Sequence, residues 1–298
     1  RKVAAEKIPS WWEIEKIWYP KHLSLEQCSS EITARYKARL LQGDSLTDLT
    51  GGFGIDCSFL ATGFKSATYV ERQEELCEIA AHNFPVLNLN HINIKNEDGV
   101  TYLQVMSPVD CLFLDPARRN EHGGKTVAIS DCEPNVAELE ELLLQKANRV
   151  MIKLSPMLDL SLALKELKQT QEVHILSVNN ECKELLILLG QTSPAEISIH
   201  CVNLSTKGTQ EEQYFVFTRE QEQCSECTYT DSLETYLYEP NASLLKAGAF
   251  RSIAAAYPVR KLHPNSHLYT SDTFIENFPA RISVSYTHLR AHETLSDL

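Results

Sequence analysis

The sequence predicts an α/β fold, in which a Rossmann-like, doubly wound seven-stranded sheet follows a helical N-terminal segment and precedes a small α+β module. Three observations predict it. Between residues 45 and 190, short apolar runs alternate with stretches of helical spacing. The first apolar run ends in a glycine-rich loop, DLTGGFGID, at 48–56. The fourth contains CLFL at 111–114, and continuous apolar runs are typical of strands that a parallel sheet buries on both faces.

Each element follows from these patterns. Apolar runs predict strands at 45–49, 66–71, 91–99, 109–119, 149–156, 172–178 and 184–190, and helical spacing predicts helices at 55–64, 72–84, 133–147 and 157–169. Pro134 suits the first turn of the third of these helices, and Asp131 suits its cap. Strands that alternate with helices imply a parallel sheet covered on both sides, which the last two strands are expected to close as an antiparallel hairpin.

Composition shifts divide the chain. We expect a helical N-terminal segment at 1–44, a main domain at 45–222 and a distinct module at 223–283 that contains a helix around 242–256; the sequence leaves the membership of a hairpin at 195–218 open. The segment SYTHLRAHET resembles translated adapter read-through, so residues 284–298 are expected to be an artefactual tail. The chain begins at Arg1 without an initiating Met, which indicates a piece of a longer protein.

Composition also limits function. The chain has 298 residues, 43% of them apolar, and a formal net charge of −12. That length allows one large domain and a smaller one. The acidic charge argues against a surface that grips nucleic acid everywhere, so any such contact is expected to be local. No apolar run is long enough for a membrane span and no signal peptide is recognisable, which predicts a cytoplasmic protein without a membrane partner.

The nine cysteines do not suggest a disulfide framework, because they are odd in number and scattered, several of them in apolar stretches. Cys224 and Cys227 are followed much later by His263 and His267. The interval from Cys227 to His263 far exceeds that of a zinc finger. The sequence therefore predicts no metal site.

The glycine loop indicates a ligand at the carboxyl ends of the strands, where glycines let backbone amides approach it. Its pattern differs from the G-x-G-x-x-G of dinucleotide sites, and the acid before it, Asp48, suits a ligand with a cationic amino-acid end. Glu71 ends the second strand, where a carboxylate can accept both ribose hydroxyl protons. Asp98 closes the third, within reach of an adenine amine.

The glycine loop and the acids at the strand ends, taken together, resemble those of class I methyltransferases that use S-adenosylmethionine. The resemblance implies that Asp48 and the loop residues Thr50, Gly51, Gly52 and Gly54 hold the methionine part and that Glu71 holds the ribose; Thr50 replaces the first glycine of the usual pattern. It also implies a catalytic motif in Asp115-Pro116-Ala117-Arg118, after the fourth strand. The C-terminal module resembles the THUMP-like domain of some bacterial methyltransferases, which implies an RNA substrate, tRNA or rRNA, by analogy, and no DNA partner.

The acceptor atom can be narrowed chemically. A pyrimidine carbon would need a covalent thiolate, and no cysteine follows the fourth or fifth strand. A base nitrogen is favoured: Asp115 would accept a hydrogen bond from the amine, Pro116 would fix the turn, and Arg118 would meet a phosphate or base edge. Lys153, on a buried central strand, is costly unless paired, and Asp115 is its expected partner.

Three alternatives stay open. Lys37, Asp115, Lys153 and Glu184 occur in the order of the tetrad of ribose 2′-O methyltransferases, in which a lysine of lowered pKa deprotonates the hydroxyl. The second alternative is a module that binds RNA or S-adenosylmethionine without turnover. The third is a small-molecule or protein methyltransferase, which the acidic charge would suit.

Overall fold

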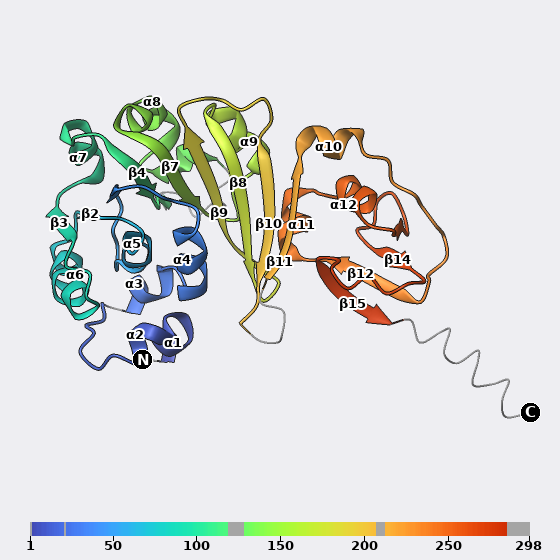
Figure 1. Ribbon diagram of the computed structural model, residues 1–298, viewed down its shortest axis with the longest axis horizontal. Coiled ribbons are helices and arrows are strands. Elements are labelled where there is room, and N and C mark those ends of the chain that lie inside the picture. Colours follow the sequence, from blue (N-terminus) through green and yellow to red (C-terminus); the bar gives the residue numbers. More distant parts are fainter. Residues whose placement is uncertain (1, 21, 119–127, 207–211, 285–298) are drawn as a thin grey trace, which may run out of the picture. The chain divides into compact units, whose positions relative to one another are not determined.

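The computed structural model describes the chain except residues 1, 21, 119–127, 207–211 and 285–298. Nine strands form a large sheet in the order β11-β10-β8-β9-β7-β4-β1-β2-β3, and four form a smaller one in the order β13-β14-β12-β15 (Figure 1). The predicted α/β fold with a large, mainly parallel sheet is confirmed. The described sheet has nine strands and not seven, because the hairpin at 195–218 adds β10 (Ser198–Leu204) and β11 (Glu212–Thr218).

The chain divides into two compact units, residues 1–171 with 186–194, and residues 172–185 with 195–298. The first unit contains the strands β1 (Ser45–Asp48), β2 (Ser66–Glu71), β3 (Ile92–Asn96), β4 (Val109–Leu114) and β7 (Ala147–Leu154). Each neighbouring pair of these strands is parallel. Parallel strands end at the same edge of a sheet. The C-terminal ends of these strands, beyond Leu46, Val70, Phe113 and Ile152, therefore lie along one edge.

The helices of the first unit connect and cover these strands. They are α1 (Lys2–Lys7), α2 (Pro9–Trp12), α3 (His22–Gln27), α4 (Glu31–Ala38), α5 (Ile55–Ala61), α6 (Glu74–Val86), α7 (Gly99–Val105), α8 (Val136–Lys146) and α9 (Leu160–Glu166), with the 3-10 turn η1 (Ile129–Asp131) and the short strands β5 (Ala117–Arg118) and β6 (Cys132–Glu133). α4 packs on α5, and α7 packs on α8.

The N-terminal helices pack on the glycine loop (Figure 1). Phe53, in the middle of the loop, contacts the Trp11 ring edge-on at 5.2 Å between centroids, and the Tyr19 ring lies 6.0 Å from it. Ile8, Leu25 and the α6 side chains complete this apolar cluster. The predicted helical segment before residue 45 therefore shares a core with the loop, and its burial of Phe53 holds the loop against the sheet.

The second unit begins with β8 (Thr170–Val178) and the start of β9 (Glu181–Gly190). Asn179 and Asn180, between them, have φ of 50° and 65°, as the type I′ turn of a two-residue hairpin requires. The predicted hairpin of the last two strands is thus present. β10 pairs with β8 in parallel, and β11 pairs with β10 in antiparallel.

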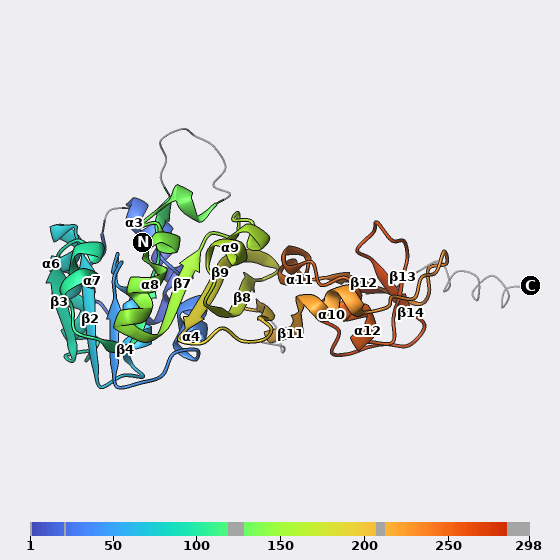
Figure 2. The ribbon, with the colours of Figure 1, turned by 90° about the horizontal axis from the view of Figure 1, so that it is seen from above.

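The rest of the second unit contains α10 (Arg219–Cys224), β12 (Tyr236–Pro240), α11 (Ala242–Ala247), α12 (Arg251–Ala256), β13 (Arg260–Lys261), β14 (Tyr269–Ser271) and β15 (Ala280–Val284) (Figure 2). α11 packs on β10, where the Ser243 hydroxyl donates to the Val202 carbonyl oxygen at 2.6 Å. The boundaries expected at 44/45 and 222/223 remain predictions.

Four local expectations change. The helix expected around 242–256 is two helices, because Gly248 ends α11 in the left-handed conformation. α8 begins after Pro134, and Asn135 caps it in place of Asp131. α7 was not expected. Val284, placed in the tail, pairs with Tyr236 in β15, and the remaining tail lies outside the described residues. Among the helices of the described ranges, none is long and apolar enough to cross a membrane.

Candidate functional site

The glycine loop between β1 and α5 is fitted to Tyr69 of β2. The Tyr69 hydroxyl donates to the Gly52 carbonyl oxygen at 2.5 Å, and a Cβ on Gly51 would lie 2.2 Å from the Tyr69 ring. Gly52 and Gly54 have φ of 54° and 86°, in the left-handed region that favours glycine. Packing therefore requires glycine at 51, and backbone conformation requires it at 52 and 54. Of the three glycines, only Gly52 has room where a Cβ would lie, with the Thr50 carbonyl oxygen at 3.7 Å.

Asp48, the last residue of β1, is fully buried beside this loop. Its Oδ1 accepts from the Thr50 amide at 2.9 Å, whereas its Oδ2 has no hydrogen-bond partner among the residues that the structure describes. Burial raises the pKa of Asp48 to about 8, and the negative charges of Asp56, Asp115 and Glu71 act in the same direction. A neutral carboxyl with an unused buried oxygen is a site where a cation would restore the charge.

Glu71, the last residue of β2, joins the first two loops. Its Oε2 accepts from the Gly52 amide at 2.9 Å, and its Oε1 accepts from the Gln73 amide at 2.8 Å. The structure therefore brings Glu71 to the glycine loop, as expected from its place after the second strand. Each carboxylate oxygen keeps a lone pair for a further donor.

Asp98 has a structural role that its sequence position did not predict. It caps α7, where its Oδ1 accepts from the amides of Val100 and Thr101, both at 3.0 Å. A Cβ on the next residue, Gly99, would lie 2.1 Å from the Leu49 carbonyl oxygen, so this turn presses against the start of the glycine loop. Asp98 itself is exposed, and its contact with adenine stays a prediction.

Thr50 connects Asp48 to the Asp-Pro corner after β4. Its hydroxyl accepts from the Asp115 amide at 2.6 Å, while its own amide donates to Asp48. The Asp115 side chain is 36% exposed, and its Oδ2 lies 2.5 Å from Lys153 Nζ. The surrounding protein desolvates Asp115 and raises its pKa, although the Lys153 ammonium opposes that shift. The expected Asp115–Lys153 pair is confirmed, and Pro116 is buried behind it.

A buried charge cluster continues from Lys153 to Lys37 of α4. Lys37 Nζ lies 2.7 Å from Asp56 Oδ1, and Lys153 Nζ lies 3.5 Å from Asp56 Oδ2. The Ser29 hydroxyl donates to Asp56 at 2.6 Å and accepts from both ammonium groups, at 2.8 Å from Lys37 and 3.0 Å from Lys153. Burial raises the pKa of Asp56, but the two ammonium groups outweigh it and hold the pKa at about 2.

Asp56 and Ser29 are the members of the site that sequence reasoning missed. Asp56 lies in the first turn of α5, two residues after the last loop glycine. Lys153 could have indicated Asp56, because a lysine predicted on a buried strand needs carboxylates as partners. Asp56, in the first turn of the helix after the loop, is close enough to be one of them. Ser29 gave no such signal, because its position depends on how the N-terminal segment packs.

Two further candidate residues, Glu184 and Arg118, stay predictions. Glu184 is buried on β9 and belongs to the second compact unit, so its part in a tetrad stays a prediction. The backbone of Arg118 forms β5 with Ala117, and its side chain lies outside the described part of the chain. Lys37, Asp115 and Lys153 are brought together through Asp56.

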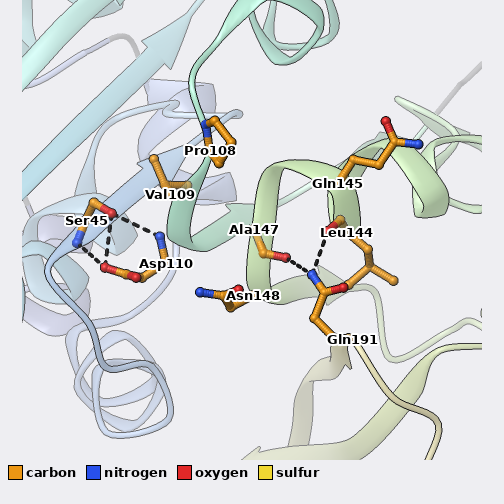
Figure 3. A pocket seen from close by; sticks show the side chains of 9 residues that line it. All are labelled: Ser45, Pro108, Val109, Asp110, Leu144, Gln145, Ala147, Asn148 and Gln191. Carbon is orange, nitrogen blue, oxygen red and sulfur yellow. Dashed lines mark hydrogen bonds between the residues drawn. The ribbon is translucent and has the colours of Figure 1, made fainter.

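A cavity of about 220 Å³ lies at the opposite end of the first unit's strands (Figure 3). Its lining includes Ser45, Val109 and Ala147, which begin β1, β4 and β7. Two hydrogen bonds join polar groups of the lining: Asp110 Oδ2 accepts from the Ser45 amide at 2.9 Å, and Gln191 Nε2 donates to the Ala147 carbonyl oxygen at 2.8 Å. The cavity is therefore separate from the acids at the carboxyl ends.

Comparisons with known proteins identify one similar structure and one matching domain family. The "putative methyltransferase from Porphyromonas gingivalis W83" is 37% identical in sequence, and the similarity covers 98% of this chain and 75% of that one with a TM-score of 0.85. A family model for a ferredoxin-like domain matches residues 236–279. The likeness of this module to a THUMP-like domain stays a prediction. A search among proteins of curated function finds no match.

Two more distant structures are similar to part of this chain. An rRNA methylase from Streptococcus thermophilus is 15% identical over 53% of this chain and 93% of its own, with a TM-score of 0.38. Precorrin-6y C5,15-methyltransferase from Geobacter metallireducens GS-15 is 12% identical over 60% of this chain and 95% of its own, with a TM-score of 0.42. Likenesses of this size say nothing about the substrate.

Proposed function

Because the chain belongs to the class I methyltransferase family that includes the Porphyromonas gingivalis protein, we propose that it is a cytoplasmic enzyme that transfers a methyl group from S-adenosylmethionine to a base nitrogen of tRNA or rRNA. One observation carries the proposal. A buried carboxyl with an unused oxygen, Asp48, is joined through Thr50 to an Asp-Pro corner that Lys153 holds.

The residues around the loop fit S-adenosylmethionine. Asp48 Oδ2 would accept from the amino group of the methionine part, since a cation is what this buried oxygen lacks. The Glu71 oxygens would accept from the ribose hydroxyls with the lone pairs that the Gly52 and Gln73 amides leave over. The cofactor supplies a methyl group on a sulfonium, which leaves the protein to orient the acceptor and share its proton.

Asp115 is suited to orient an amine. Its amide is fixed by Thr50 and its Oδ2 by Lys153, so the carboxylate cannot rotate freely, and its second oxygen can accept from the acceptor's N–H. Pro116 fixes the chain direction after this carboxylate. Arg118 would meet a phosphate or base edge of the RNA. Lys153 acts as a positioning residue, and its ammonium group opposes the rise that burial causes in the pKa of Asp115.

Ribose 2′-O methylation is the second candidate, favoured by the contacts that join Lys37, Lys153 and Asp115 in one cluster. A lysine must be neutral to take a proton from a hydroxyl. A carboxylate oxygen 2.5 Å from Lys153 Nζ favours the ammonium form instead. The base nitrogen is therefore the better supported acceptor.

The test incubates the full chain with labelled S-adenosylmethionine and total RNA, and identifies the modified nucleoside by mass spectrometry. We expect label in a base, and a loss of at least about 100-fold in rate for Asp115→Ala, in the range of general acid–base contributions. The control is Asp44→Asn, whose side chain is 70% exposed before β1 and pairs only with Lys65 among the described ion pairs. Label in ribose would favour the second candidate. Cofactor binding without transfer would favour a binding module, and unchanged transfer by Asp115→Ala would refute the assignment.

A further inference from the structure

The second unit carries a cluster of metal-ligand side chains that the proposed function does not use. Glu172 and His174 lie on β8 and His200 lies on β10, and one ligand atom from each lies within 4.8 Å of the others. β8 and β10 are parallel, with His174 directly opposite His200 and Glu172 opposite Ser198. Because side chains alternate along a strand, all three point to the same face of the sheet.

The contacts within the cluster orient the rings. The two imidazoles stack, with centroids 4.1 Å apart and 12° between their planes. His174 Nε2 lies 3.2 Å from Glu172 Oε2. The Ser198 hydroxyl lies 3.0 Å from His200 Nε2, and the Tyr214 hydroxyl of β11 meets His200 Nδ1. Hydroxyl groups rotate easily, so they can release a ring nitrogen to a stronger ligand.

We propose that Glu172, His174 and His200 bind a divalent transition-metal ion of the zinc type. Two imidazoles and a carboxylate are a donor set that such ions prefer, with water in the fourth position. Bonds of about 2.0–2.1 Å place tetrahedral donors roughly 3.4 Å apart, so side-chain rotation must close a present spacing of at most 4.8 Å by up to about 1.4 Å. Glu172 and His200 are half-buried, which leaves the cluster accessible from solvent, whereas His174 is buried.

The proposed ligands come from two strands, Glu172 and His174 from β8 and His200 from β10. Bound to both strands, the ion would cross-link β8 and β10.

The test titrates Co²⁺ and Zn²⁺ into the full chain in a Cys182→Ser, Cys224→Ser, Cys227→Ser background, which removes the exposed and half-buried thiols of the second unit. We expect one Co²⁺ per chain, with d–d absorption of low-symmetry coordination and without the sulfur-to-cobalt charge transfer that thiolate ligands produce. His174→Ala and His200→Ala should each weaken binding at least about tenfold. Metal binding should also raise the Tm of the parent chain but not of these variants.

His263→Ala is the matched control, since His263 is exposed and outside the cluster; it should bind as the parent does. Equal affinity in the parent and His200→Ala would overturn the proposal. So would a spectrum with thiolate charge transfer, or no binding by a chain whose circular dichroism shows it folded. This result is independent of methyl transfer.

Discussion

The affinity for the cofactor should depend on pH through Asp48. Burial raises the pKa of this carboxyl to about 8 in the free protein, so at pH 7 only about a tenth of the molecules carry it ionised. The amino group that we place at its unused oxygen favours the ionised form. Binding must therefore release a proton, and the affinity should rise with pH up to about 8.

The magnitude follows from the same pKa. If the ionised form alone binds, the apparent association constant rises about tenfold between pH 6 and pH 7 and levels off near pH 8. About 0.9 proton should leave per S-adenosylhomocysteine bound at pH 7. S-adenosylhomocysteine serves as the probe because it keeps the amino group and does not react.

Isothermal titration calorimetry in buffers of different ionisation enthalpy measures both quantities. Asp48→Asn cannot ionise, so its binding should be weaker and independent of pH over this range, while Asp44→Asn should keep the full pH dependence. A wild-type affinity that is flat between pH 6 and pH 7, with no proton released, would refute the reasoning.

Three further outcomes follow from the structure. Asp48→Asn should stabilise the free protein by up to about 4 kcal/mol at pH 7 and by under about 2 kcal/mol at pH 5, because folding must protonate a carboxyl whose pKa rises from 3.8 to about 8. Urea unfolding at both pH values measures the difference in unfolding free energy, and a stabilisation that does not change with pH would contradict the prediction. Gly51→Ala should cost about 1–3 kcal/mol through the Tyr69 ring, whereas Gly63→Ala, whose nearest neighbour would lie at 3.7 Å, should unfold at nearly the wild-type urea concentration. Asp56→Asn should cost about 3–5 kcal/mol because it leaves two buried ammonium groups short of a carboxylate, and adding Lys37→Met should recover part of that loss; a double variant no more stable than the single one would speak against the pairing.

The sequence predicts the first unit's strands well because each is a local pattern. The strand expected at 66–71 matches β2 residue for residue, and Glu71 ends it as expected, whereas β1 ends at Asp48, one residue before the expected end. The Asp115–Lys153 pair was also predictable, since a lysine on a buried strand needs a carboxylate.

What the sequence missed depends on tertiary packing or on short capping signals. Asp56 and Ser29 reach the lysines because α4 and α5 pack together, which no local pattern specifies. α7 is one of the shorter helices, and its cap, Asp98, was interpreted only as a ligand-binding acid. The break at Gly248 was readable in principle, since glycine is the usual residue at a helix C-terminus.

The charges of the site explain why a stable protein keeps a costly carboxyl. Among the named residues, Asp56 takes both lysines and Asp115 shares one of them, whereas Asp48 and Glu71 rely on backbone amides. Because of burial and this excess of acids, the pKa of Asp48 is raised to about 8 in the free protein, so Asp48 is mostly protonated at pH 7. A ligand with a positive charge at this position stabilises the ionised form of Asp48, whereas a neutral ligand does not. The buried carboxyl, which destabilises the free protein, therefore makes binding selective for a cationic ligand.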